Sequence, residues 1–268
     1  MEVVILKDAD SVAAYAADLV VELLRVKPAA VLGLATGSTQ LALYRCLVRQ
    51  HLAGKLSFKQ TTSFNLDEYL GVAVENSQSY RAYMDREFFD RIDIDKGKTN
   101  LPFCTDGENP RLVGPLYEQK ICDAGGIDLQ LMGIGANGHI GFNEPSSSLC
   151  SRTRVKTLTK QTLEDNGRLF NDDEFQPRLA ITMGIATIMD ARRILLLATG
   201  KTKADAVANT VEGPVSAMCP ASVLQMHERA TVLLDEDAAA GLANRDYYDW
   251  THLQNESLKN RFGIDHEV

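Results

Sequence analysis

Seven short runs rich in apolar residues recur along the chain, and in most of them apolar residues follow one another instead of alternating with polar ones. Continuous apolarity of this kind is typical of strands that are buried on both faces, as in parallel sheets. We therefore expect strands at Val3–Leu6, Ala30–Ala35, Thr62–Leu66, Ile127–Ile134, Leu179–Met183, Ile194–Ala198 and Thr231–Leu234.

Segments with apolar residues at helical spacing lie between these runs. Strands that alternate with helices predict right-handed crossovers, and so an α/β fold: a three-layer α/β/α Rossmann-like domain with a mainly parallel central sheet. The first expected helix begins after Ser11 and ends before Pro28. The others are expected at Leu41–Leu52, Ser79–Phe89, Leu112–Ala124, Lys203–Val211 and Ala238–Asp249.

The chain shows no internal repeat or linker-like change of composition, so residues 1–268 are expected to form one domain. The segment Ser151–Pro177 differs from the rest because about one residue in three is charged and few are apolar. It is either a solvated helix-loop or a mobile lid over a site.

Composition narrows the class of protein. The 268 residues include 28 Lys and Arg against 36 Asp and Glu, and the net charge of −8 disfavours binding to nucleic acid. No apolar run approaches the ~20 residues that cross a bilayer, and the N-terminus resembles no signal peptide, so we expect a cytoplasmic protein. The five cysteines and five histidines lack the spacings of disulfide frameworks and metal sites, and no metal is expected.

Chemically unusual residues follow four of the predicted strands, where open α/β sheets bind ligands. After Ala30–Ala35 comes Thr36-Gly37-Ser38-Thr39 at the start of a helix. Free N–H groups, a glycine and two hydroxyls there suit a phosphate, and an ordinary N-cap with a tight turn explains them equally well. The loop lacks the Gly-Lys-Ser/Thr ending that nucleotide triphosphate sites use.

The second of these strand ends is acidic, because Asp67-Glu68-Tyr69 follows Thr62–Leu66. A carboxylate just past a buried strand is poorly solvated, which raises its pKa and suits a general base that removes a proton from carbon. The alternative is an N-cap or a solvated pair of acids. Only one of the two acids need be catalytic.

The third of these strand ends, residues 133–145, is rich in glycine. Positions 133–138 satisfy Gly-x-Gly-x-x-Gly, but Gly141 and Pro145 interrupt the helix that a dinucleotide site requires. We interpret the match as accidental. The glycines instead permit a loop that places His139 beside Asn137 and Glu144, as a proton shuttle near neutral pH.

At the fourth of these strand ends, Gly200-Lys201-Thr202-Lys203 turns into a helix. Its ammonium groups would add to an anion site, although solvated lysines are common on loops. Two anion-binding ends and two acid–base ends in one sheet predict a phosphorylated substrate that undergoes proton transfer.

In these motifs the chain resembles the glucosamine-6-phosphate deaminase family, also called glucosamine-6-phosphate isomerase, nearly from end to end. Only about the last thirty residues match weakly. The resemblance is found in Leu-Gly-Leu-Ala-Thr-Gly-Ser-Thr (32–39), Phe-Asn-Leu-Asp-Glu-Tyr (64–69), Gly-Ala-Asn-Gly-His-Ile-Gly-Phe-Asn-Glu-Pro (135–145) and Ser-Arg-Thr-Arg-Val-Lys-Thr-Leu-Thr (151–159).

The resemblance implies conversion of glucosamine 6-phosphate and water to fructose 6-phosphate and ammonia, without metal or organic cofactor. It assigns ring opening to His139, assisted by Asn137 and Glu144, and transfer of the C2 proton to C1 to Asp67. Many family members have Asp where this chain has Asn137, which leaves Glu144 as the anionic partner of the imidazole. The phosphate-binding residues implied are Gly37, Ser38, Thr39, Gly133, Arg168 and Lys203.

Some members of this family are hexamers that N-acetylglucosamine 6-phosphate activates at a site between subunits. The resemblance therefore implies a homo-oligomer, with a hexamer favoured, and a possible activator. The residues that match the activator site are Ser147, Ser148, Arg154, Lys156, Thr157 and, if a one-residue gap is allowed, Tyr248.

Three other functions remain as alternatives. One is a related sugar-phosphate isomerase or lactonase, although a lactonase has no use for a carbon base. Another is a non-catalytic sugar-phosphate sensor of a transcription regulator, which needs a DNA-reading segment that we do not expect ahead of Val3. The last, a nicotinamide-dependent oxidoreductase, depends only on the glycine fingerprint.

Overall fold

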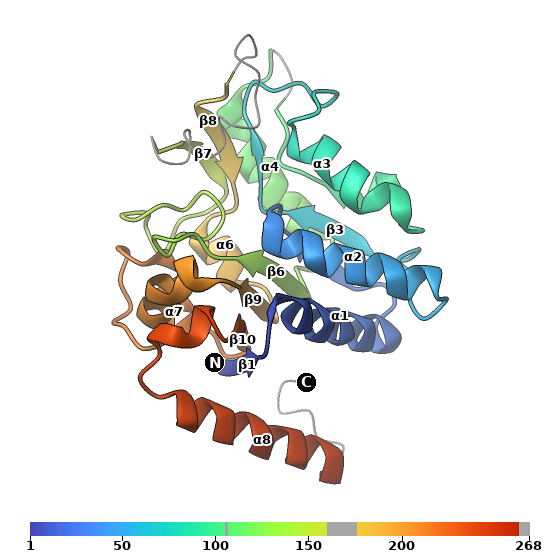
Figure 1. Cartoon of the computed structure of the whole chain (residues 1–268). Coiled ribbons are helices and arrows are strands. Elements are labelled where there is room, and N and C mark those ends of the chain that lie inside the picture. The colour runs from blue at the N-terminus through green and yellow to red at the C-terminus, as the bar shows by residue number, and fades with distance from the viewer. Residues whose placement is uncertain (105–106, 160–175, 263–268) are drawn as a thin grey trace.

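A parallel sheet of seven strands forms the centre of the molecule (Figure 1). The computed structural model describes residues 1–104, 107–159 and 176–262. Six of the seven predicted runs lie in this sheet, and the expected three-layer α/β fold is confirmed. In spatial order the strands are β1 (Glu2–Leu6), β10 (Ala230–Asp235), β9 (Ile194–Ala198), β6 (Leu129–Gly133), β2 (Val31–Leu34), β3 (Thr62–Asn65) and β5 (Thr99–Asn100).

Helices cover both faces of the sheet, which explains why its strands are continuously apolar. In β9, Leu195 and Leu197 belong to one hydrophobic cluster, and Leu196 between them belongs to the other. Successive side chains of a strand point to opposite faces, so both faces need apolar residues. The first cluster contains α1 (Ala9–Val26), α2 (Ser38–Leu52) and α3 (Tyr80–Glu87), and the second contains α4 (Pro110–Asp123), α6 (Ile185–Met189) and α7 (Ala204–Val211).

The strand predicted at Leu179–Met183 exists, but its expected place in the parallel sheet is wrong. It forms β8 (Leu179–Thr182), the middle strand of a separate antiparallel sheet. Its neighbours are β4 (Asp67–Tyr69) and β7 (Arg154–Thr157), with Asp67 and Arg154 both opposite Thr182. Continuous apolarity reports that a strand is buried, and it does not identify the partner strand.

This second sheet also bears on the segment Ser151–Pro177. Its first part is anchored, because β7 pairs with β8 and both Thr153 and Leu158 are buried. Residues 160–175 lie outside the described residues. The lid therefore stays a prediction, and the solvated alternative is wrong for Thr153 and Leu158.

The largest differences from the expected helices are at the start of α1 and in the C-terminal region. Helix α1 begins at Ala9, because Asp8 and not Ser11 is the N-cap and accepts the Ser11 N–H at 2.8 Å. Helix α2 begins at Ser38, so the helix start predicted at Thr36-Gly37-Ser38-Thr39 is confirmed. The helix predicted at Ala238–Asp249 is a short 3₁₀ turn, η5 (Ala238–Gly241), followed by α8 (Arg245–Phe262).

Glu212 explains the break between η5 and α8, since its carboxylate accepts the backbone N–H groups of Ala243 and Asn244, both at 2.8 Å. Helix α8 then runs along the edge strand β1 (Figure 1). Among the described residues, no helix has the length and apolarity needed to span a membrane.

Candidate active site

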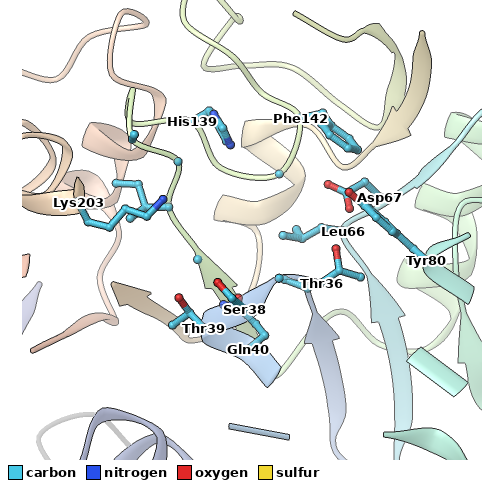
Figure 2. Close-up of a pocket in the computed structure, with 17 residues that line it drawn as sticks. Thr36, Ser38, Thr39, Gln40, Leu66, Asp67, Tyr80, His139, Phe142 and Lys203 are labelled. Carbon is cyan, nitrogen blue, oxygen red and sulfur yellow. The ribbon is translucent and has the colours of Figure 1, made fainter. Parts of the chain in front are cut away.

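The four unusual strand ends meet in one cleft of about 460 Å³ at the carboxyl edge of the central sheet (Figure 2). The turn after β2, the junction of β3 with β4, the glycine-rich loop after β6 and the turn after β9 all line it. The lining residues are Ala35, Thr36, Gly37, Ser38, Thr39, Gln40, Leu66, Asp67, Tyr80, Gly133, Ile134, Gly135, Ala136, His139, Gly141, Phe142 and Lys203.

One end of the cleft suits an anion. Gly37 is the N-cap of α2 with φ of 126°, and Ser38 and Thr39 form the first turn of the helix. The N–H groups of a first turn have no acceptor within their own helix, and the helix dipole is positive there. Lys203 extends its amino group into the same end (Figure 2). Together these donors can hold a phosphate dianion.

Asp67 lies toward the other end of the cleft and is almost fully buried, with 6% of its surface exposed. Burial, reinforced by the charge of neighbouring Glu68, raises the pKa of Asp67 to about 8, although the Phe142 N–H donates to its carboxylate. Once ionised, a carboxylate with this pKa is a stronger base than a solvated carboxylate, which suits a general base.

Glu68, the next residue, has a different environment. Its carboxylate accepts backbone N–H groups from Tyr69 at 2.8 Å and from Tyr80 and Arg81 at 2.9 Å, the last two at the start of α3. Burial raises the pKa of Glu68, and the three N–H groups oppose that shift. Glu68 thus binds β4 to α3, and Asp67 faces the cleft.

His139 is held by a chain of hydrogen bonds. Its Nδ1 lies 2.7 Å from Asn137 Oδ1, and Asn137 Nδ2 donates to Glu144 Oε2, also at 2.7 Å. Glu144 Oε2 is itself 3.4 Å from Nδ1. Because an amide oxygen only accepts, Nδ1 must carry the proton, which leaves Nε2 of the neutral ring as a proton acceptor.

The glycines around His139 serve packing. A Cβ on Gly135 would lie 2.2 to 2.5 Å from three ring atoms of His139, and a Cβ on Gly141 would lie 3.2 Å from Asp67 Oδ2. No helix lies in the segment 134–153, which the structure describes throughout. The fingerprint at 133–138 therefore does not open the helix that dinucleotide binding requires.

We expect Gly135→Ala to lower turnover by about tenfold to 10²-fold, because the methyl group displaces the His139 ring and small misplacements are costly. Steady-state kinetics with circular dichroism measures this. The control is Gly54→Ala, at φ of 70°, where an added methyl group would meet no atom within 4 Å. It should lose about 1 kcal/mol of stability and keep its turnover. Equal turnover in both variants would contradict the role of Gly135.

Sequence reasoning missed an aromatic wall beside Asp67. The rings of Tyr80 and Phe142 stack at 6.1 Å between centroids, and Tyr69 lies 4.7 Å from Tyr80. Tyr80 lies on α3, outside the motif at 64–69. That motif points to Tyr80 only indirectly, through the Glu68 carboxylate, which accepts the Tyr80 N–H. Thr36 and Phe142 lie within the motifs at 32–39 and 135–145, but other residues of those motifs carried the prediction of the site. Gln40 lies one residue beyond the motif at 32–39.

Two groups of predicted residues lie elsewhere. Arg168 lies outside the described residues. The residues that match the activator site do not form one cluster within a chain, since Arg154 and Lys156 lie on β7 and Tyr248 lies on α8, at opposite ends of the molecule (Figure 1). Tyr248 donates to Glu212 Oε1 at 3.1 Å, and Arg154 donates to Asn143 Oδ1 at 2.9 Å. Ser147 is buried, and Ser148 and Thr157 complete the set.

Metal ligands do not gather anywhere within the described ranges. These ranges contain no group of three or more His, Cys, Asp or Glu side chains that could hold an ion.

Comparisons with known proteins identify relatives over nearly the whole chain. Residues 7–233 match the family described as glucosamine-6-phosphate isomerases/6-phosphogluconolactonase. The glucosamine-6-phosphate deaminase of Colwellia psychrerythraea is 60% identical over 99% of both chains, and that of Pseudoalteromonas translucida is 55% identical over 98% of both.

Solved structures show the same fold. A protein described as a monomeric glucosamine-6-phosphate deaminase superposes with a TM-score of 0.86 at 43% identity, over 90% of this chain and all of the other. The 6-phosphogluconolactonase of Trypanosoma cruzi superposes with a TM-score of 0.73 at 19% identity, over 90% of this chain and 97% of the other. The second likeness concerns the fold alone.

Proposed function

The chain belongs to the family of glucosamine-6-phosphate isomerases and 6-phosphogluconolactonases, and we propose that it converts glucosamine 6-phosphate and water to fructose 6-phosphate and ammonia. The main support is that the Asp67 carboxylate and the His139 imidazole face one cleft with an anion site at its end (Figure 2). Relatives of this name, similar over nearly the whole chain, support the same conclusion.

The reaction begins with the phosphate bound by the N–H groups and hydroxyls of Ser38 and Thr39 and by Lys203. Gly37 lets the anion approach the backbone. Arg168 belongs to this proposal as a further phosphate ligand, and Gly133 as a point of backbone access. Anchoring the phosphate orients the sugar carbons toward Asp67, so binding energy remote from the reacting atoms assists the chemistry.

His139 then opens the pyranose ring. Its Nε2 takes the proton of the O1 hydroxyl as the C1–O5 bond breaks, and returns that proton to O5. Asn137 holds the imidazole ring of His139 through Nδ1, and the Glu144 carboxylate stabilises the transient imidazolium.

Asp67 acts on the open-chain aldehyde. Its carboxylate removes the proton from C2 and O1 takes a proton from water, which gives an enolamine, and the C2 proton is then delivered to C1. The C2 iminium ion that results adds water and loses ammonia and a proton, which leaves fructose 6-phosphate. Burial of Asp67 strengthens it as a base, and it stands at the end of the cleft away from the phosphate.

A lactonase is the nearest competing function, and the carboxylate of Asp67 argues against it, because a lactonase needs an activated water and no carbon base.

The proposal extends to regulation and assembly, with N-acetylglucosamine 6-phosphate as activator and a homo-oligomer, a hexamer being favoured. Tyr248 would then complete the site of Arg154 and Lys156 in another subunit. A cytoplasmic location belongs here too, since the five free thiols suit a reducing compartment.

Release of ammonia from glucosamine 6-phosphate tests the function directly. We expect ammonia and fructose 6-phosphate in equal amounts without added metal, and no hydrolysis of 6-phosphogluconolactone. The opposite pattern would make the chain a lactonase.

Added N-acetylglucosamine 6-phosphate should lower the substrate concentration at half-maximal rate. A hyperbolic rate curve that it leaves unchanged would remove the activator site, and light scattering measures the assembly.

A further inference from the structure

Gln40 is a buried polar residue of the cleft to which neither the motifs nor the mechanism above gives a role. It lies in the first turn of α2, lines the cleft, and has 2% of its surface exposed. Its Nε2 has no hydrogen-bond partner within the part of the chain that the structure describes. A buried donor without an acceptor is costly and uncommon in folded proteins, so it calls for an explanation.

Two glycines enclose the carboxamide of Gln40. A Cβ on Gly133 would lie 3.1 Å from Nε2 and 3.2 Å from Oε1, and a Cβ on Gly37 would lie 3.3 Å from Oε1. The space beside the Gly133 Cα is therefore occupied by this side chain. The enclosure holds the carboxamide between the end of β6 and the N-cap of α2, at the wall of the cleft.

We propose that the Gln40 carboxamide is a ligand of the substrate phosphate and donates a hydrogen bond from Nε2 to a phosphate oxygen. The inference rests on the proposed function for the identity of the ligand. Figure 2 shows Gln40 beside Ser38 and Thr39, at the end of the cleft that suits an anion. A bound anion supplies the acceptor that Nε2 lacks.

Rotation of the carboxamide makes this contact possible. A half-turn about the Cγ–Cδ bond exchanges Nε2 and Oε1, and the preference of this torsion is broad. The side chain can thus present its donor to the cleft without moving the backbone of α2. A purely structural role would be different: Gln at the third position of a helix can accept the N–H of its own N-cap, here Gly37, and would then stabilise the helix start.

Gln40→Met separates the two roles, because it keeps the length of the side chain and removes both polar groups. We expect KM for glucosamine 6-phosphate to rise about tenfold with kcat within about twofold, the size of a lost hydrogen bond to a charged group. The melting temperature without ligand should stay equal or rise, since an unpaired buried donor is gone. The rise in melting temperature that inorganic phosphate causes should shrink.

Gln225→Met is the matched control. Its Nε2 donates to the carbonyls of Thr210 at 2.8 Å and Gly213 at 2.7 Å, so its amide is satisfied within the fold. We expect this variant to melt at a lower temperature with KM unchanged. Gln40→Glu adds a charge that repels the phosphate, and it should raise KM more than Gln40→Met does.

Wild-type KM and a wild-type response to phosphate in Gln40→Met would overturn the inference. So would a melting temperature lowered as in Gln225→Met with KM unchanged. The proposed function fails separately, if the wild type releases no ammonia. The phosphate-induced shift in melting temperature would still test Gln40 in that case, because it needs no turnover.

Discussion

Replacing Asp67 with Asn is expected to lower turnover by about 10² to 10⁴-fold with little change in KM. The amide keeps the shape of the side chain but cannot take the C2 proton. Asp67 lies toward the end of the cleft away from the phosphate, so binding is largely preserved (Figure 2). Steady-state rates of ammonia release, with KM determined for both proteins, measure the effect.

The pH dependence of the wild type follows from the same carboxylate. Because the pKa of Asp67 is raised to about 8 and the base must be ionised, kcat/KM should rise with pH through that region. The Asn variant should lose this limb of the profile. Near-normal turnover in the variant would remove Asp67 from the mechanism.

Stability should change in the opposite direction to activity. The folded protein keeps Asp67 protonated up to about pH 8, whereas the unfolded chain ionises it near pH 4. The folded state therefore binds more protons in this window, and Asp67 makes the protein progressively less stable as pH rises through it. The Asn variant should melt at a higher temperature than the wild type, by a margin that widens from pH 4 to pH 8.

Glu68→Gln is the control for both measurements. The amide group of Gln cannot accept all three N–H groups from Tyr69, Tyr80 and Arg81, so this variant should melt at a lower temperature. Its turnover should fall by less than about tenfold, since Glu68 does not line the cleft. A larger loss than that of Asp67→Asn would exchange the roles assigned to the two acids.

Local sequence predicted the parts of the site that lie within one strand end. Asp67 and His139 each follow a buried strand, and the carboxyl ends of parallel strands share an edge, so their meeting follows from topology. Tyr80 and Gln40 enter the cleft from α3 and from the first turn of α2, and only tertiary packing places their side chains there.

The fold shows the same limit. Leu195, Leu196 and Leu197 predicted a strand buried on both faces, because each face of the sheet has its own helices. Ala180 and Ile181 are equally buried, yet β8 pairs with β4 and β7, strands of three and four residues with too few apolar positions to detect. Burial is thus encoded locally, and the choice of partner strand is not.

Replacing His139 with Gln is expected to lower turnover on the closed-ring sugar phosphate by about 10² to 10⁴-fold. Gln can keep a hydrogen bond to Asn137, but it has no group that accepts a proton near neutral pH and gives it back. An open-chain analogue of the substrate needs no ring opening, so its loss should be much smaller. The ratio of the two losses is the measurement.

Asn137→Asp extends this prediction to the partner of the imidazole. A carboxylate 2.7 Å from Nδ1 stabilises the imidazolium, so the pH at which ring opening loses its base should move upward. The open-chain analogue should show no such movement. Equal losses on both substrates in His139→Gln would exclude ring opening as the role of His139, and would leave Asp67 as the acid–base residue supported by the cleft.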